Sequence, residues 1–149
     1  MAAIFLDTSA LVRRYDRSEP GASRVKAICA PARGHALLLA RVASVEVASA
    51  LARKSRDGTL GVAERTRLWR LFRAHWRDQY QVVAMTEDAY AHAERVLFRS
   101  PLRALDALHV GCALVVAAQL PQIGLQFWTA DEQQARAADA EGLAVEVVT

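Results

Sequence analysis

The chain has 149 residues, of which 53% are hydrophobic, so it can bury a packed core and wholesale disorder is excluded. The net charge is only +3, but 17 of the 19 basic residues are arginine, which fits phosphate contacts and equally fits a coding bias. The two cysteines, Cys29 and Cys112, share no motif, which excludes a disulfide framework and favours a reduced, cytoplasmic protein.

The apolar pattern alternates between short runs typical of strands and longer runs with helical spacing. In chain order it predicts a strand at 2–6, helices at 8–15 and 20–30, a strand at 36–40, helices at 44–56 and 62–76, a strand at 80–85, helices at 87–98 and 100–120, a strand at 126–129, a helix at 131–140 and a strand at 143–148. Ser100 is expected to cap the helix that it opens, with Pro101 in the first turn.

The sequence also indicates how many domains the chain forms and whether it carries a leader or a membrane span. No repeat or linker is visible, so residues 1–149 are expected to form one domain. The N-terminal segment lacks a basic region, and its apolar stretch ends at Asp7, so no secretory leader is expected. The longest apolar run, 110–120, is about half of the roughly 20 residues that a membrane span requires.

Strands separated by helices predict an α/β fold with three layers, in which helices cover both faces of a mostly parallel sheet of four to five strands. Ligands of such sheets bind beyond the carboxyl ends of the strands. Asp7 follows the first strand, Glu46 lies in the first turn after the second, and Asp131 follows the fourth. We therefore expect these three carboxylates to meet at one edge of the sheet.

Each of these carboxylates also has a simpler interpretation. Asp7 is a good helix N-cap, and Glu46 is a favourable charge near a helix N-terminus. Asp131 with Gln134 has the spacing of a capping box, as has Thr129 with the following Glu132. Position alone does not separate these interpretations from a catalytic one.

Asp106 is the most informative acidic residue, because the segment LRALDALHVGCALVV around it is apolar on nearly every side. A carboxylate buried there without a partner would be expensive, so it is expected beside a cation, which is either a metal ion or Arg103 three residues earlier. His109 shares the face of Asp106, and three roles remain open for it: metal ligand, support for the site, or structural residue. A site made only of carboxylates suits Mg²⁺ or Mn²⁺ rather than Zn²⁺.

Four segments, DTSAL, SVEVASAL, RALDALH and TADEQQARAADAEGLAVEVV, occur in the order and spacing of the PIN-domain ribonucleases, and the short chain resembles the VapC-type toxins of toxin–antitoxin pairs. The resemblance covers essentially the whole chain. It implies a parallel sheet flanked by helices, one or two Mg²⁺ or Mn²⁺ ions, endonucleolytic cleavage of RNA, and a homodimer bound by a cognate antitoxin. It places Asp7, Glu46, Asp106 and Asp131 at the acidic positions of the family, and Thr8, Ser9 and Thr129 at its hydroxyl positions.

The reaction expected from this resemblance is attack of water on an RNA phosphodiester, with Asp7 and Asp106 as the principal metal ligands. Arg13, Arg14 and Arg41 flank the motifs and are candidates for phosphate contacts. The alternative is a PIN fold that only binds RNA or a protein. The helix at 62–76 carries two tryptophans, and is either a core helix with a solvated arginine face or a surface for dimerisation or antitoxin docking.

Overall fold

The computed structural model describes all 149 residues. The strands are β1 (Ala3–Leu6), β2 (Ala36–Ala40), β3 (Tyr80–Val83), β4 (Gln126–Thr129) and β5 (Ala144–Val147). The helices are α1 (Thr8–Leu11), α2 (Ala22–Cys29), α3 (Ala43–Arg56), α4 (Val62–Asp78), α5 (Glu87–Arg99), α6 (Ala104–Gln119) and α7 (Glu132–Ala140), with 3₁₀ turns η1 (Val12–Arg14) and η2 (Pro31–Arg33).

The five strands form one parallel sheet in the order β3-β2-β1-β4-β5, which confirms the predicted sheet. β1 is central, with Ile4 opposite Leu37 of β2 on one side and opposite Gln126 of β4 on the other. The chain moves from β1 to β2 in one direction and reaches β4 on the other side, so β1 and β4 flank the point at which the strand order reverses. Open α/β sheets bind ligands at such a point.

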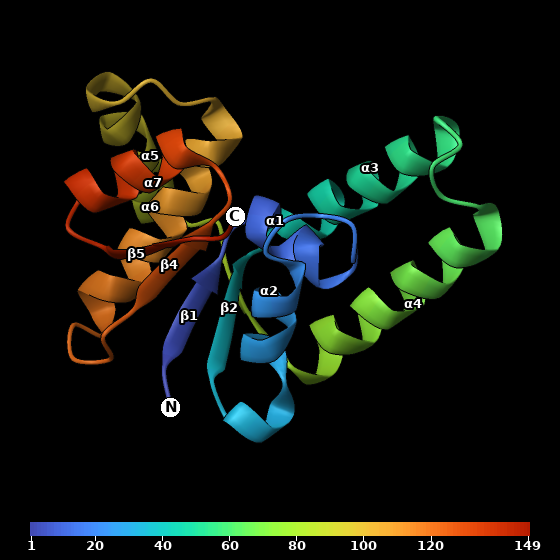
Figure 1. The fold of residues 1–149 in the computed structure, drawn as a ribbon. Helices are drawn as coiled ribbons and strands as arrows, with labels where there is room; N and C mark the ends of the chain where they lie inside the picture. The colour runs from blue at the N-terminus through green and yellow to red at the C-terminus, as the bar shows by residue number, and fades with distance from the viewer.

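Helices cover both faces of the sheet, as the three-layer prediction requires (Figure 1). Alternate residues of β1 serve opposite cores: Ile4 and Leu6 pack with α1, α2, α3 and α4, whereas Ala3 and Phe5 pack with α5, α6 and α7. Both faces of the strand are therefore buried, which explains why its sequence is continuously apolar rather than alternating.

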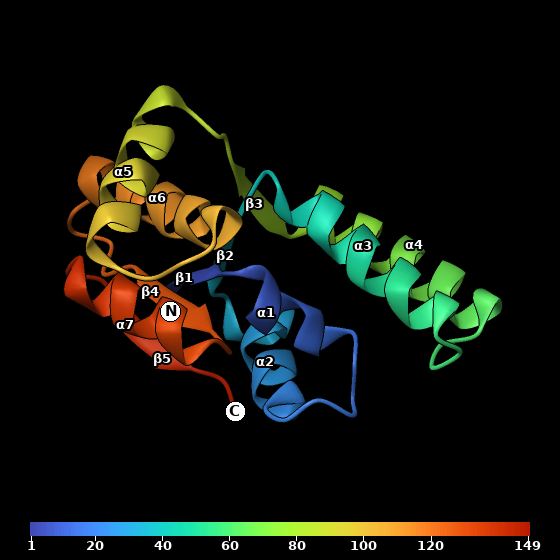
Figure 2. The ribbon, with the colours of Figure 1, turned by 90° about the horizontal axis from the view of Figure 1, so that it is seen from above.

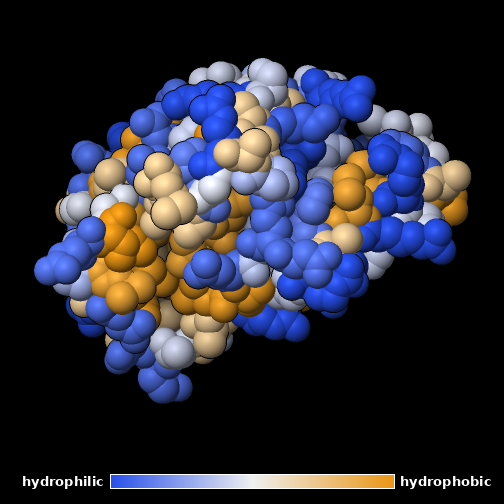
Figure 3. Space-filling view, turned by 90° about the horizontal axis from the view of Figure 1, so that it is seen from below, coloured by the Kyte–Doolittle hydropathy of each residue, from blue (hydrophilic) through white to orange (hydrophobic).

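The helices α3 and α4 form a long hairpin that projects from the rest of the molecule (Figure 2). Seen from below, the hairpin side is mostly hydrophilic with a small apolar area, while a larger apolar area lies on the side of α5, α6 and α7 (Figure 3). None of the helices has the length and hydropathy needed to cross a membrane.

The predicted start of α6 is wrong. Ser100 caps the C-terminal end of α5 by donating its backbone N–H to the carbonyl of Val96, and its backbone is extended. Pro101 has no N–H to extend the hydrogen bonds of α5, which explains why α5 ends before it. α6 begins only at Ala104, with Arg103 as the N-cap residue. The other predicted boundaries differ from the structure by a few residues at most.

Candidate active site

Asp7 follows β1 directly and is almost fully buried, with 2% of its surface exposed. Its Oδ1 accepts the backbone N–H of Ala10 at 3.1 Å, so Asp7 is the N-cap of α1, and it also accepts the Ser9 hydroxyl at 2.8 Å. Burial raises the pKa of Asp7 to about 6, although the charge of His109 and these hydrogen bonds oppose the rise. The capping interpretation is therefore confirmed, and it leaves Oδ2 without a hydrogen bond.

Glu46 and His109 form the closest charged contact of this region. His109 Nε2 lies 2.5 Å from Oε1 of Glu46, and the hydroxyl of Thr8 donates to the same oxygen at 2.9 Å. Burial alone would raise the pKa of Glu46, but the hydrogen bond and charge of His109 outweigh it and lower the pKa. Burial likewise opposes protonation of His109, but Glu46 and the charges of Asp7 and Asp106 raise its pKa.

Asp106 lies in the first turn of α6 and its Oδ2 accepts Nε of Arg103 at 3.3 Å. The spacing of Arg103 and Asp106 suggested an ion pair, and this pair is present. Because the Arg103 side chain is 88% exposed, the ion pair contributes little to stability. The backbone carbonyl of Asp106 accepts the side-chain amide of Gln134, which ties α6 to α7.

Asp131 is the N-cap of α7, with Oδ1 accepting the backbone N–H groups of Gln133 at 2.9 Å and Gln134 at 3.4 Å. Only half of the predicted capping box forms, because the fully buried Gln134 side chain turns away to Thr129 and Asp106. Thr129 in turn contacts the Ser9 hydroxyl at 3.2 Å, which links the end of β4 to α1. The local sequence pattern indicates only a capping role for Gln134, and nothing in it reveals that this side chain joins α7 to β4 and α6.

All four carboxylates follow the carboxyl ends of strands or begin α6, but the structure joins them only in part. His109 contacts Glu46 directly, and the charges of Asp7 and Asp106 act on its pKa from a greater distance. Each of the four carboxylates uses one oxygen within the protein, and the other has no hydrogen bond: Oδ2 of Asp7, Oε2 of Glu46, Oδ1 of Asp106 and Oδ2 of Asp131. Free carboxylate oxygens fit a hard divalent ion. As they stand, however, no three acidic, histidine or cysteine side chains lie close enough to hold one, so binding would require some of them to turn.

The three arginines considered for phosphate contacts have different surroundings. Arg13 is held by the carbonyls of Ser9 and Pro20, and Arg14 donates to the Tyr80 hydroxyl on the α1–α4 side of the sheet. Arg41 is exposed and directly follows β2, at the edge of the sheet where the carboxylates lie. Of the three, Arg41 therefore has the surroundings best suited to contact a bound polyanion.

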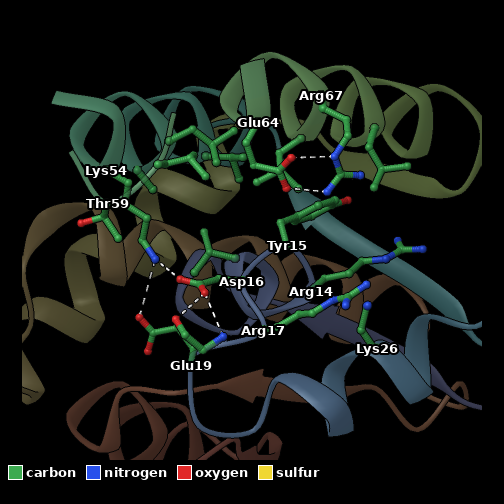
Figure 4. A pocket seen from close by; sticks show the side chains of 18 residues that line it. Arg14, Tyr15, Asp16, Arg17, Glu19, Lys26, Lys54, Thr59, Glu64 and Arg67 are labelled. Atoms are coloured by element: carbon green, nitrogen blue, oxygen red, sulfur yellow. Dashed lines mark hydrogen bonds and ion pairs between the residues drawn. The ribbon is translucent and has the colours of Figure 1, made fainter. Parts of the chain in front are cut away.

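A cavity of about 660 Å³ lies apart from the four carboxylates, between the loop after η1 and the α3–α4 hairpin. Its wall is apolar in part, and charged pairs surround it (Figure 4). Lys54 reaches across to Asp16 and lies 3.9 Å from Glu19, and Arg67 pairs with Glu64. These contacts attach the hairpin to the loop that follows η1.

The chain belongs to the PIN domain family, whose profile it matches over residues 4–140. A comparison with curated protein sequences finds no match. Solved structures share the fold over nearly the whole chain. VapBC2 from Rickettsia felis, bound to a promoter DNA fragment, superposes with a TM-score of 0.66 at 9% identity, covering 99% of both chains.

Two further structures are similar in the same way. VapC20 from Mycobacterium tuberculosis, a toxin that cleaves the sarcin–ricin loop, gives a TM-score of 0.64 at 20% identity and covers 98% of this chain and 99% of its own. FitAcB from Neisseria gonorrhoeae gives 0.61 at 16% identity, with 95% of each chain covered. At these identities the likeness establishes the fold.

Proposed function

We propose that this protein is a Mg²⁺- or Mn²⁺-dependent endoribonuclease and the toxin of a VapC-type toxin–antitoxin pair. The observation that carries the proposal is the set of four carboxylates at the carboxyl end of a PIN-domain sheet, each with one oxygen fixed by the protein and one free. A bound divalent ion would supply Lewis-acid stabilisation of the charge that develops on the phosphoryl oxygens.

The protein's own residues have separate tasks in this proposal. Asp7 and Asp106 would hold the ion through their free oxygens, and Glu46 and Asp131 would complete the site directly or through water. Ser9 and the backbone of Ala10 fix the orientation of the Asp7 carboxylate, because both donate to the same oxygen. Water would attack the phosphorus and the P–O3′ bond would break, with a proton passing to the departing O3′, so the expected products carry a 5′-phosphate and a 3′-hydroxyl.

His109 and Thr8 would act as positioning residues. Both contact Oε1 of Glu46, so together they fix that carboxylate in one rotamer and leave Oε2 to face a ligand or water. The structural neighbours VapBC2 and FitAcB support a cognate antitoxin as partner. A homodimer is the assembly that we expect for such a toxin. The two buried, free cysteines suit the cytoplasm, where thiols stay reduced.

The deciding experiment incubates purified protein with total RNA and maps the new 5′ ends. We expect cleavage with Mg²⁺ or Mn²⁺, none in excess EDTA, and recovery when Mn²⁺ is restored. Asp7→Asn and Asp106→Asn should each lower the rate by about 10³-fold or more, because each removes a charged ligand. Thermal melting should show that both variants stay folded.

Undiminished cleavage in EDTA would point instead to a metal-free ribonuclease. The folded protein could also bind RNA without cutting it under any metal condition. That result would support the alternative function, in which the PIN fold serves only as a binding module. That alternative is favoured by one observation, the absence of three metal-binding side chains within reach of one another.

A further inference from the structure

Arginine and tryptophan side chains alternate along one side of α4. The guanidinium of Arg41 lies over the ring of Trp76, 5.2 Å from its centroid. The guanidinium of Arg73 lies 5.8 Å from the centroid of Trp76 and 5.9 Å from that of Trp69. These four residues, Arg41, Trp76, Arg73 and Trp69, form what is called below the Arg–Trp ladder.

The cations of the ladder have no carboxylate partner. Two other arginines of α4 are paired, Arg67 with Glu64 and Arg77 with Asp78, whereas Arg65 and Arg70 also lack an ion pair but lie over no aromatic ring. Neither Arg41 nor Arg73 forms an ion pair, and both are exposed. Stacking on an indole orients a guanidinium without using its N–H groups, so these donors stay available to an anion.

The ladder connects the sheet edge to the projecting hairpin. Arg41 directly follows β2, and its side chain donates to the hydroxyl of Ser44, two residues before Glu46. At the other end, Trp69 and Arg65 line a second hollow of about 310 Å³ between α3 and α4. A chain that lies on the ladder would thus run from the neighbourhood of the carboxylates outward along the hairpin seen in Figure 2.

We propose that the Arg–Trp ladder is a docking surface for single-stranded RNA outside the cleavage site. Alternating phosphates and bases match this arrangement: the guanidinium N–H groups take phosphate oxygens, and the outer guanidinium planes take stacked bases. The half-buried indoles pack against the core and hold those planes in place. An acidic protein would satisfy the charges but would leave the guanidinium planes without a stacking partner. The choice of RNA over another nucleic acid rests on the proposed function.

The test measures binding without cleavage. A fluorescent uridine oligomer of about 15 nucleotides, titrated in EDTA across a range of salt concentrations, reports affinity and its salt dependence by anisotropy. The variant Arg41→Gln/Arg73→Gln is compared with Arg33→Gln/Arg95→Gln, which removes the same charge from two exposed arginines that have no ion pair and lie over no aromatic ring.

We expect the ladder variant to bind RNA about tenfold more weakly at physiological salt. The slope of log affinity against log salt should become shallower by about 1.4, which is about 0.7 for each lost phosphate contact. The control should lose less than about half of its affinity. RNA should also quench tryptophan fluorescence in the wild-type protein, and less so in Trp69→Phe, which keeps an aromatic ring in the same place but gives no indole signal.

Equal affinity and slope in the ladder and control variants would overturn the docking surface while leaving RNA cleavage, measured separately with Mg²⁺, intact. Ladder-dependent RNA binding without any cleavage would support the docking surface and overturn the proposed ribonuclease. A glutamate peptide of matched length that binds as tightly as the RNA, through the same two arginines, would show that the surface serves an acidic protein instead, and the proposal would fail.

Discussion

His109 Nε2 and Glu46 Oε1 lie 2.5 Å apart, although 63 residues separate them in the chain. The contact joins α6 to α3 across the carboxyl end of the sheet. His109 is 99% buried, and its Nδ1 is the one buried side-chain polar atom without a hydrogen bond. The imidazole is therefore held through Nε2 only, by Glu46 and Thr8.

The energetic coupling of this pair can be measured. His109→Ala leaves a cavity and a half-buried carboxylate without its main partner, so we expect a loss of about 2–4 kcal/mol in the free energy of unfolding. A double-mutant cycle with Glu46→Gln, followed by urea denaturation, should give a coupling energy of about 1–3 kcal/mol. Additive effects of the two substitutions would contradict the contact.

Two variants of Asp131 test whether its carboxylate is needed for cleavage in addition to capping α7. Asp131→Asn keeps an N-cap, whereas Asp131→Ala removes it and should lower stability by about 1 kcal/mol. If the carboxylate is needed for cleavage, both variants should lose activity to a similar extent despite their different stabilities. Full activity in Asp131→Asn would limit this residue to capping α7.

Gly111 allows α5 and α6 to approach closely. A Cβ at this position would overlap the carbonyl oxygen of Ala89 and lie 3.1 Å from the backbone nitrogen of Ala93. Gly111→Ala should therefore destabilise the protein by about 1–3 kcal/mol, even though alanine is the better helix former. Gly61→Ala, at the N-cap of α4 where a Cβ meets no atom within 4 Å, is the comparison without overlap and should cost less than about 1 kcal/mol.

His75 should make stability depend on pH. Burial, with help from the charge of Arg14, lowers the pKa of His75 to about 4, while the nearby Asp78 opposes the shift. Its Nδ1 contacts the Tyr15 hydroxyl at 2.7 Å, and that hydroxyl also contacts Tyr80. An unfolded chain protonates this histidine near pH 6.5, before the folded one does, so the favourable contribution is complete above that pH and is lost as the pH falls toward 4.

The measurement compares wild-type protein with His75→Asn by urea denaturation between pH 7.5 and pH 4.5. The difference between their free energies of unfolding should change in that interval, because the wild-type protein alone loses the contribution of the imidazole. Parallel curves for the two proteins would show that His75 titrates normally in the folded state.

Local sequence patterns determined most of the secondary structure. The run of apolar residues in β1 predicts a strand that is buried on both faces, and the spacing of α4 predicts an amphipathic helix. Asp7 and Asp131 cap the helices that follow them, because capping depends only on the next few residues. The start of α6 was the exception, since Ser100 closes α5 and α6 begins only after Arg103.

The family itself could be recognised from four short segments, and the match over residues 4–140 confirms it. Which oxygens of the acidic residues are bound and which are free could not be predicted, because it depends on partners distant in sequence. Thr8 and His109 share Oε1 of Glu46, and Gln134 spans β4 and α6. None of these contacts produces a local pattern.

The sequence by itself thus determined the order of strands and helices and the caps of α1 and α7, because both arise from interactions between near neighbours. Only the tertiary structure decided that His109 contacts Glu46 and that Arg41 stacks on an indole 35 residues further along the chain. Charge and stacking act through space over a few ångströms, so they depend on how the elements pack.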